Sequence, residues 1–221
     1  MHPPWSMIFF TTLAGAAQGL LLALVGIELG ATVGVIAPAP DNSLYITGAA
    51  IVLLFGAIGL VAATFHLGHP LRAWRSAAMW RTSWLSREII VLPAFLACVA
   101  LWSTMHWLGG TTLGWGLAAA MLALLLYLCT GMIYAAVKAI REWATPLTPW
   151  NYALLGMASG LMLCTALAAA LAPTLTAPLA MATLVTTLAG GVSRGLTLWR
   201  NLTLPPKTTV QTAIGVRHPR I

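Results

Sequence analysis

Apolar residues occur in long, nearly unbroken runs along this chain, and short polar segments rich in Pro, Gly, Asn and Asp separate them. An apolar run of about 20 residues is long enough to cross the hydrocarbon core of a bilayer as a helix. Six runs qualify: 8–29, 45–65, 88–108, 113–137, 152–172 and 177–197. The pattern therefore predicts an all-α integral membrane protein with a bundle of six transmembrane helices.

Composition supports this interpretation and excludes a soluble domain. Of the 221 residues, 60% are hydrophobic and only 7% are charged, whereas about a quarter of the residues in an ordinary soluble domain are charged. The net charge of +7 comes from 11 Lys and Arg against 4 Asp and Glu. The placement of these basic residues indicates membrane topology rather than nucleic-acid binding.

The basic residues lie between the second and third runs, between the fourth and fifth, and after the sixth, whereas the other three connections contain no Lys or Arg. With six spans, all the basic segments fall on one side of the membrane. The positive-inside rule places that side, with both chain termini, in the cytoplasm of a bacterial inner membrane. The opposite face has Glu28, Asp41 and His106, and we interpret His106 as an interface residue.

The three cysteines, Cys98, Cys129 and Cys164, lie inside apolar runs and form no CxxC motif or Cys/His cluster. We interpret them as inert buried thiols, and no metal site is expected in this chain.

One short stretch, "FHLGHPLRAWRSAAMWRTSWLSREI" at 65–89, concentrates two His, four Arg and one Glu between two apolar runs. His66 ends the second run and Glu88 opens the third, so an antiparallel helix pair places both at one membrane depth. The segment between them could fold back as a short amphipathic piece. Structural explanations also exist: Ser86 could cap the third helix with Glu88 complementing its dipole. The arginines could be topogenic or could bind lipid phosphates.

A more specific interpretation is a quinone site. Quinone reduction adds two electrons and two protons, so it needs hydrogen-bond donors at the carbonyl oxygens and a proton path to water. A His and a carboxylate at the edge of the membrane supply both, and apolar helix walls would hold the isoprenoid tail.

Several motifs resemble those of the membrane-anchor subunit of the dimethyl sulfoxide reductase family. They are "IFFTTLAGAAQGL" at 8–20, "HLGHPLRAWRS" at 66–76, "SWLSREI" at 83–89 and "REWATPLTPWNYALLGMASG" at 141–160. The resemblance implies an anchor that holds a molybdopterin catalytic subunit and an iron–sulfur subunit on the membrane. The chain would be the non-catalytic subunit, exchanging electrons with ubiquinone or menaquinone.

The resemblance also implies functional residues. The His of "HLG" and the Glu of "LSxE", implicated at the quinol site of the family, match His66 and Glu88, and Arg72 matches the Arg of "PxRA". Together with His69, these are the expected quinone-binding residues. The residues expected to dock the partner subunits are basic and lie on the same side of the membrane: Arg75, Arg81, Arg200, Lys207 and Arg217.

Two departures from the typical dimethyl sulfoxide reductase anchor refine the expectation. That anchor has eight spans and its "HLG" loop faces the periplasm, whereas here six spans place the arginine-rich loop in the cytoplasm. The layout is more similar to anchors of cytoplasm-facing, quinone-linked sulfite-oxidising molybdoenzymes. We therefore expect a six-helix domain at 1–198 and a cytoplasmic tail at 199–221 that docks on the partners.

Four alternatives remain open at this point. The chain could be a quinol-oxidising anchor of the dimethyl sulfoxide reductase type, or a scaffold without a redox site. A haem b anchor would need two His facing each other at one depth, and no His lies in the middle of a span. A transporter would need polar lining near the midplane, where Gln18 is the notable polar group.

The charge distribution makes a topology prediction. Reporter fusions at residues 40, 110 and 175 should all report the periplasm, because each lies in a connection without Lys or Arg. Alkaline phosphatase and green fluorescent protein fusions measure this, and a cytoplasmic signal at any of the three positions would contradict the six-span arrangement.

Overall fold

The structure, a computed structural model, describes residues 5–65 and 70–204, with the backbone alone at 70–74. The described residues form helices without strands, and six of the helices are long and apolar enough to cross a membrane. In chain order the elements are α1 (Trp5–Thr32), α2 (Asn42–Thr64), η1 (Pro70–Met79), α3 (Trp84–Leu108), α4 (Leu113–Ala135), α5 (Leu147–Leu171), η2 (Pro173–Leu175) and α6 (Thr176–Leu202). The predicted fold class and number of spans are confirmed.

Helix ends differ from the predicted runs because capping, and not hydropathy, decides where a helix begins. The third helix begins at Trp84, four residues before the predicted start, because Ser83 adopts an extended backbone and its hydroxyl accepts from the Ser86 amide at 3.3 Å. The interpretation of Ser86 as the N-cap is therefore wrong. Glu88 becomes the fifth helical residue, beyond the first turn in which the helix dipole is strong.

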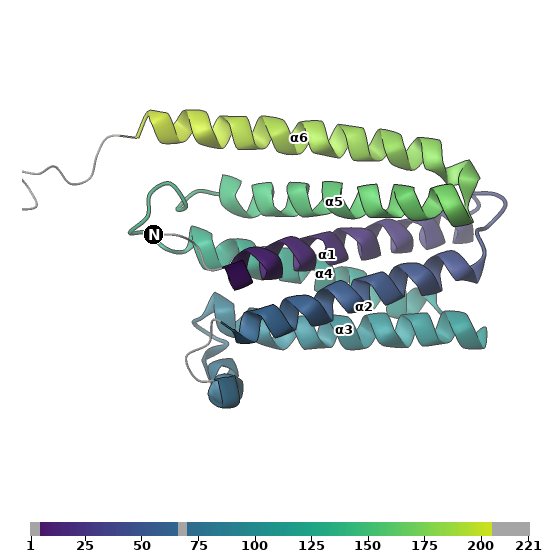
Figure 1. The fold of residues 1–221 in the computed structure, drawn as a ribbon, viewed down its shortest axis with the longest axis horizontal. Helices are drawn as coiled ribbons and strands as arrows, with labels where there is room; N and C mark the ends of the chain where they lie inside the picture. Colours follow the sequence, from purple (N-terminus) through teal and green to yellow (C-terminus); the bar gives the residue numbers. More distant parts are fainter. Residues whose placement is uncertain (1–4, 66–69, 205–221) are drawn as a thin grey trace, which may run out of the picture.

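The six helices run up and down, so their ends gather at two ends of the bundle (Figure 1). One end carries the start of α1, the segment with η1, the connection between α4 and α5, and the end of α6. Apart from the start of α1, these segments and the first turn of α3, with Arg87, hold the Lys and Arg residues of the described chain. The 3-10 helix η1 occupies part of the stretch predicted to fold back as a short piece, and it packs against α3.

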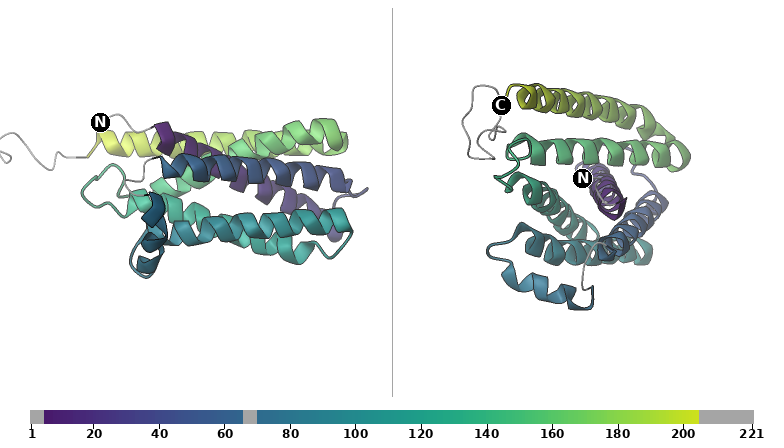
Figure 2. Two further views of the ribbon diagram at one scale, coloured as in Figure 1. Left: turned by 60° about the horizontal axis from the view of Figure 1, so that its bottom comes forward. Right: turned by 60° about the vertical axis from the view of Figure 1, so that its left-hand side comes forward.

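The first helix occupies the centre of the bundle and packs against α2, α4 and α5 (Figure 2). Its contact with α5 is the closest, because both helices present glycine there. A Cβ atom added to Gly160 would overlap the carbonyl carbon of Gly19, and one added to Gly19 would lie 2.5 Å from the Gly156 carbonyl oxygen. The two backbones therefore touch directly, as small residues allow between membrane helices.

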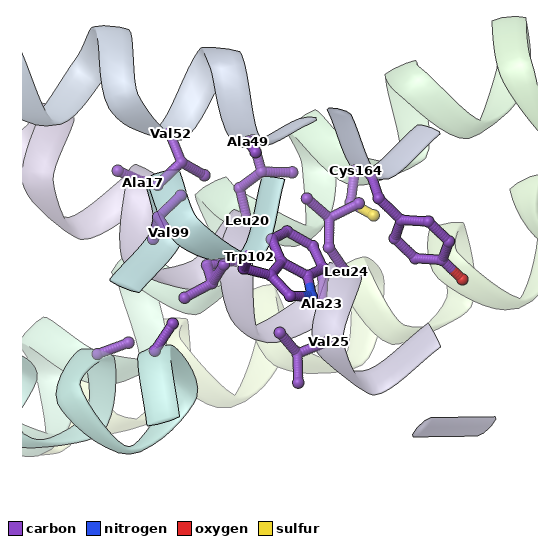
Figure 3. Packing of buried hydrophobic residues seen from close by; sticks show 14 of the residues in the cluster. Ala17, Leu20, Ala23, Leu24, Val25, Ala49, Val52, Val99, Trp102 and Cys164 are labelled. Carbon is purple, nitrogen blue, oxygen red and sulfur yellow. The ribbon is translucent and has the colours of Figure 1, made fainter. Parts of the chain in front are cut away.

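Apolar side chains fill the space between α1 and its neighbours on the other side (Figure 3). Leu20 and Leu24 of α1 pack with Val52 of α2 and with Val99 and Trp102 of α3, and all five side chains are fully buried. In contrast, α6 packs mainly on α5 and exposes most of its apolar side chains. The tight core is thus built from α1 to α5, and α6 lies at its edge.

The glycine contact predicts a large difference between two similar substitutions. Gly160→Ala should destabilise the protein by about 2 kcal/mol or more, because the methyl group would overlap the α1 backbone. The matched control is Gly191→Ala on α6, where an added Cβ meets nothing within 4 Å, so stability should hold or rise slightly. Thermal unfolding in detergent measures both, and equal stability of the two variants would contradict the backbone contact.

Candidate functional site

Glu88 is the predicted quinone-site residue whose side chain the structure describes. His66 and His69 lie outside the described residues, and Arg72 lies on η1, where the backbone alone is described. Glu88 is on α3, one turn beyond its start and at the end of the bundle that carries η1. The described helix η1, which carries Arg72, thus lies at the same end of the bundle as Glu88.

The Glu88 side chain points into the bundle and not into the surrounding lipid. The residue is only 4% exposed, and its Oε1 accepts a hydrogen bond from the Thr130 hydroxyl of α4. A carboxyl group in an apolar bundle needs such a partner, because burial without one is costly. Its depth and partner distinguish it from a carboxylate that simply complements a helix end.

Polar side chains continue from Glu88 toward the centre of the bundle. The Tyr152 hydroxyl of α5 lies beside Thr130 and donates to the Thr11 carbonyl of α1 at 3.2 Å. Gln18 of α1 also lies near Tyr152, but neither of its buried amide atoms meets hydrogen-bond geometry with a described residue. A polar path therefore joins four helices behind Glu88, and it ends at the buried Gln18 amide.

Arg87 precedes Glu88 and has a structural role. Its guanidinium donates to the carbonyl oxygens of Trp80 and Arg81, both at 2.9 Å, and lies 4.2 Å over the Trp84 ring. These contacts connect the turn after η1 to the first turn of α3. They hold the backbone in place just before Glu88. The Glu88 carboxyl group is bonded to Thr130 and not to Arg87.

A second polar feature lies at the same end, between α4, α5 and α6. A cavity of about 300 Å³ is lined there by residues that include Tyr134, Glu142, Asn151 and Arg194. Asn151 donates to the Thr197 hydroxyl at 2.8 Å, whereas its buried Oδ1 has no hydrogen-bond partner within the described chain. Both polar features of this end therefore lie on the side of the bundle that carries the basic residues.

The predicted docking residues have different surroundings. Arg75 on η1 and Arg81 after it are exposed, and the Arg81 guanidinium lies 5.3 Å over the Trp80 ring. Arg200 is half-buried and donates to the Arg141 carbonyl at 3.2 Å, which connects the end of α6 to the segment before α5. Lys207 and Arg217 lie outside the described residues, and α6 continues to Leu202, past the predicted start of the tail.

The opposite end of the bundle holds a pair that sequence reasoning missed. His106, interpreted from the sequence as an interface residue, lies in the last turn of α3, but its side chain is only 5% exposed and packs inside the bundle. Its Nε2 lies 3.5 Å from Oε1 of Glu28, and the Trp102 indole donates to Glu28 Oε2 at 2.8 Å. The sequence did carry a signal: Glu28 and His106 are each close to a helix end on the same side of the bundle.

Comparison with known proteins finds a family and two relatives that this chain resembles. The model of a family described as "DMSO reductase anchor subunit (DmsC)" matches residues 1–216. The chain is 46% identical over 235 aligned positions to a sulfite dehydrogenase subunit of Allochromatium vinosum, covering all of this chain and 72% of that protein. It is 28% identical over 166 positions to one chain of the anaerobic dimethyl sulfoxide reductase of Haemophilus influenzae, covering 73% of this chain and 57% of that protein. No solved structure matches.

Proposed function

Because the chain belongs to the family of DMSO reductase anchor subunits, we propose that it passes electrons between an iron–sulfur partner subunit and the quinone pool. The partner complex would also contain a molybdopterin catalytic subunit. The greater similarity to a sulfite dehydrogenase subunit than to a dimethyl sulfoxide reductase chain supports sulfite oxidation. Electrons from sulfite would then reduce the quinone, either ubiquinone or menaquinone.

The observation that carries the proposal is the buried Glu88 carboxyl group, held by Thr130 at the end of the bundle with the basic residues. Quinone reduction consumes two electrons and two protons, and it needs groups that can hand over protons next to an apolar binding surface. Glu88 is such a group, and the neighbouring residues Leu85 and Ile90 expose apolar side chains against which an isoprenoid tail would lie. In the proposal Glu88 relays protons from the cytoplasm, and Thr130 holds its orientation.

The neighbouring residues have complementary roles in the proposal. His66, which the sequence places just before η1, would donate to one quinone carbonyl, and His69 and Arg72 would complete the polar side of the site. Arg75 and Arg81 would face the iron–sulfur subunit, because both are exposed at this end of the bundle. The partners would therefore lie on the cytoplasmic side of a bacterial inner membrane, consistent with the positive-inside rule.

Substitutions at the site test this role. His66→Ala should abolish quinone-coupled sulfite oxidation, and Glu88→Gln should slow it less, because water can substitute as a proton relay. Thr130→Val should slow it as well, because it removes the hydrogen bond that orients Glu88. Turnover with a soluble dye should be unchanged in all three, because it bypasses the anchor.

The control is Glu142→Gln, which removes a carboxylate at the same end that lines a different cavity. It should leave quinone-coupled rates unchanged. Assembly must be measured on the same membranes, since loss of the complex would resemble loss of the site. Normal quinone-coupled turnover in an assembled His66→Ala complex would refute the proposed site.

The tail supplies a separate test of docking. Residues 205–221 are polar and basic, with Lys207, Arg217 and Arg220 against no Asp or Glu. We propose that this segment lies along the iron–sulfur subunit and holds it at the membrane. Deleting it should release the partner subunits from washed membranes, as measured by immunoblotting. Complete retention of the partners would exclude the tail as the main docking element.

A further inference from the structure

A polar pocket lies at the end of the bundle away from η1, far from the proposed quinone site. It has a volume of about 400 Å³ and opens among the ends of α1, α2, α3 and α4. Its polar lining includes Glu28, Asn42, Tyr45, His106 and Thr112. Glu28 and His106 are only 6% and 5% exposed, so the pocket is built over two buried ionisable side chains.

Asn42 determines which imidazole nitrogen of His106 carries hydrogen. The Asn42 amide nitrogen donates to the His106 carbonyl at 3.1 Å, so the Asn42 oxygen must face the ring, where it lies 3.1 Å from Nδ1. An amide oxygen accepts only, so Nδ1 is the donor. In the neutral ring Nε2 then has a lone pair and no hydrogen. Tyr45 stacks on the same ring with centroids 4.5 Å apart and holds it in place.

Two acceptors consequently face each other beside the pocket. His106 Nε2 lies 3.5 Å from Glu28 Oε1, within ion-pair distance, and neither atom makes a closer hydrogen bond among the described residues. The other carboxylate oxygen of Glu28 is already used by the Trp102 indole. A positively charged donor between Oε1 and Nε2 would satisfy both atoms at once, and unsatisfied buried acceptors are costly.

The connections at this end supply no other cation. All three of them lack Lys and Arg, so a positive charge beside Glu28 comes either from a proton on His106 or from a ligand. The pocket also reaches the start of α4, where the Thr112 side chain makes no cap hydrogen bond and lies beside the Glu28 carboxyl group. The free amides of a helix N-terminus favour an anionic group. The pocket is thus complementary to a zwitterion with a donor-bearing cation at one end and an anion at the other.

We propose that this pocket binds the head group of phosphatidylethanolamine from the leaflet away from η1. The primary ammonium group donates to Glu28 Oε1 and His106 Nε2, and the phosphate lies toward the start of α4. The acyl chains remain in the bilayer, which this end of the bundle meets. A bare metal ion fits less well, because the pocket is far larger than an ion and its described lining offers Glu28 and His106 alone as usual ligand side chains.

Lipid retention tests the proposal without any measurement of turnover. The full chain in its complex is placed in nanodiscs with equal amounts of phosphatidylethanolamine, phosphatidylcholine and phosphatidylglycerol, extracted, and analysed by native mass spectrometry. Phosphatidylethanolamine should be retained about tenfold over the other two, because the choline group has no N–H donor and glycerol has no charge. Glu28→Gln should remove this preference, and Thr112→Val should weaken it.

Matched controls separate the site from general effects of charge. Asp41→Asn removes an acidic group at the same end but outside the pocket lining, and it should keep the lipid preference. Equal retention of all three lipids, or an unchanged preference in Glu28→Gln, would overturn the proposal and leave a structural pair bridged by a proton. Binding of soluble O-phosphoethanolamine without lipid retention would assign the pocket to a free solute and would overturn the lipid assignment.

Discussion

Direct contact between the backbones of α1 and α5 is the constraint on which the rest of the structure depends. Gly19, Gly156 and Gly160 leave no room for a methyl group between the two helices. In a bilayer there is no gain from hiding apolar surface from water, so close packing of this kind supplies much of the attraction between helices. The contact holds α1 in the centre, where one face meets α5 and the other faces meet α2 and α4.

The central position of α1 also determines where polar groups can be buried. Glu28 near one end of α1 reaches Trp102 and His106 of α3, and Gln18 lies near the polar path behind Glu88. Between these groups the described core around Leu20, Leu21 and Leu24 is apolar. The two buried carboxyl groups therefore have separate surroundings, a neutral hydroxyl at Glu88 and an imidazole at Glu28.

Sequence reasoning predicted the number of helices and their up-and-down order because hydropathy reports directly on exposure to lipid. It placed the start of α3 four residues late, since the hydroxyl of Ser83 and not the apolar run ends the preceding turn. Glu88 was identified from a motif, but its bond to Thr130 depends on the rotation of α4, which no sequence pattern specified. The pairing of Glu28 with His106 was missed for the same reason.

The peripheral position of α6 has a consequence for biosynthesis. The glycine face of α1 packs against α5, which follows α2, α3 and α4 in the chain, so during synthesis that face lacks its native partner until α5 is inserted. Insertion of α5 closes the tight core, and α6 then adds to the outside of an assembled five-helix unit, since it packs mainly on α5. The contact at the centre of the fold therefore forms late in synthesis, after most of the chain has entered the membrane.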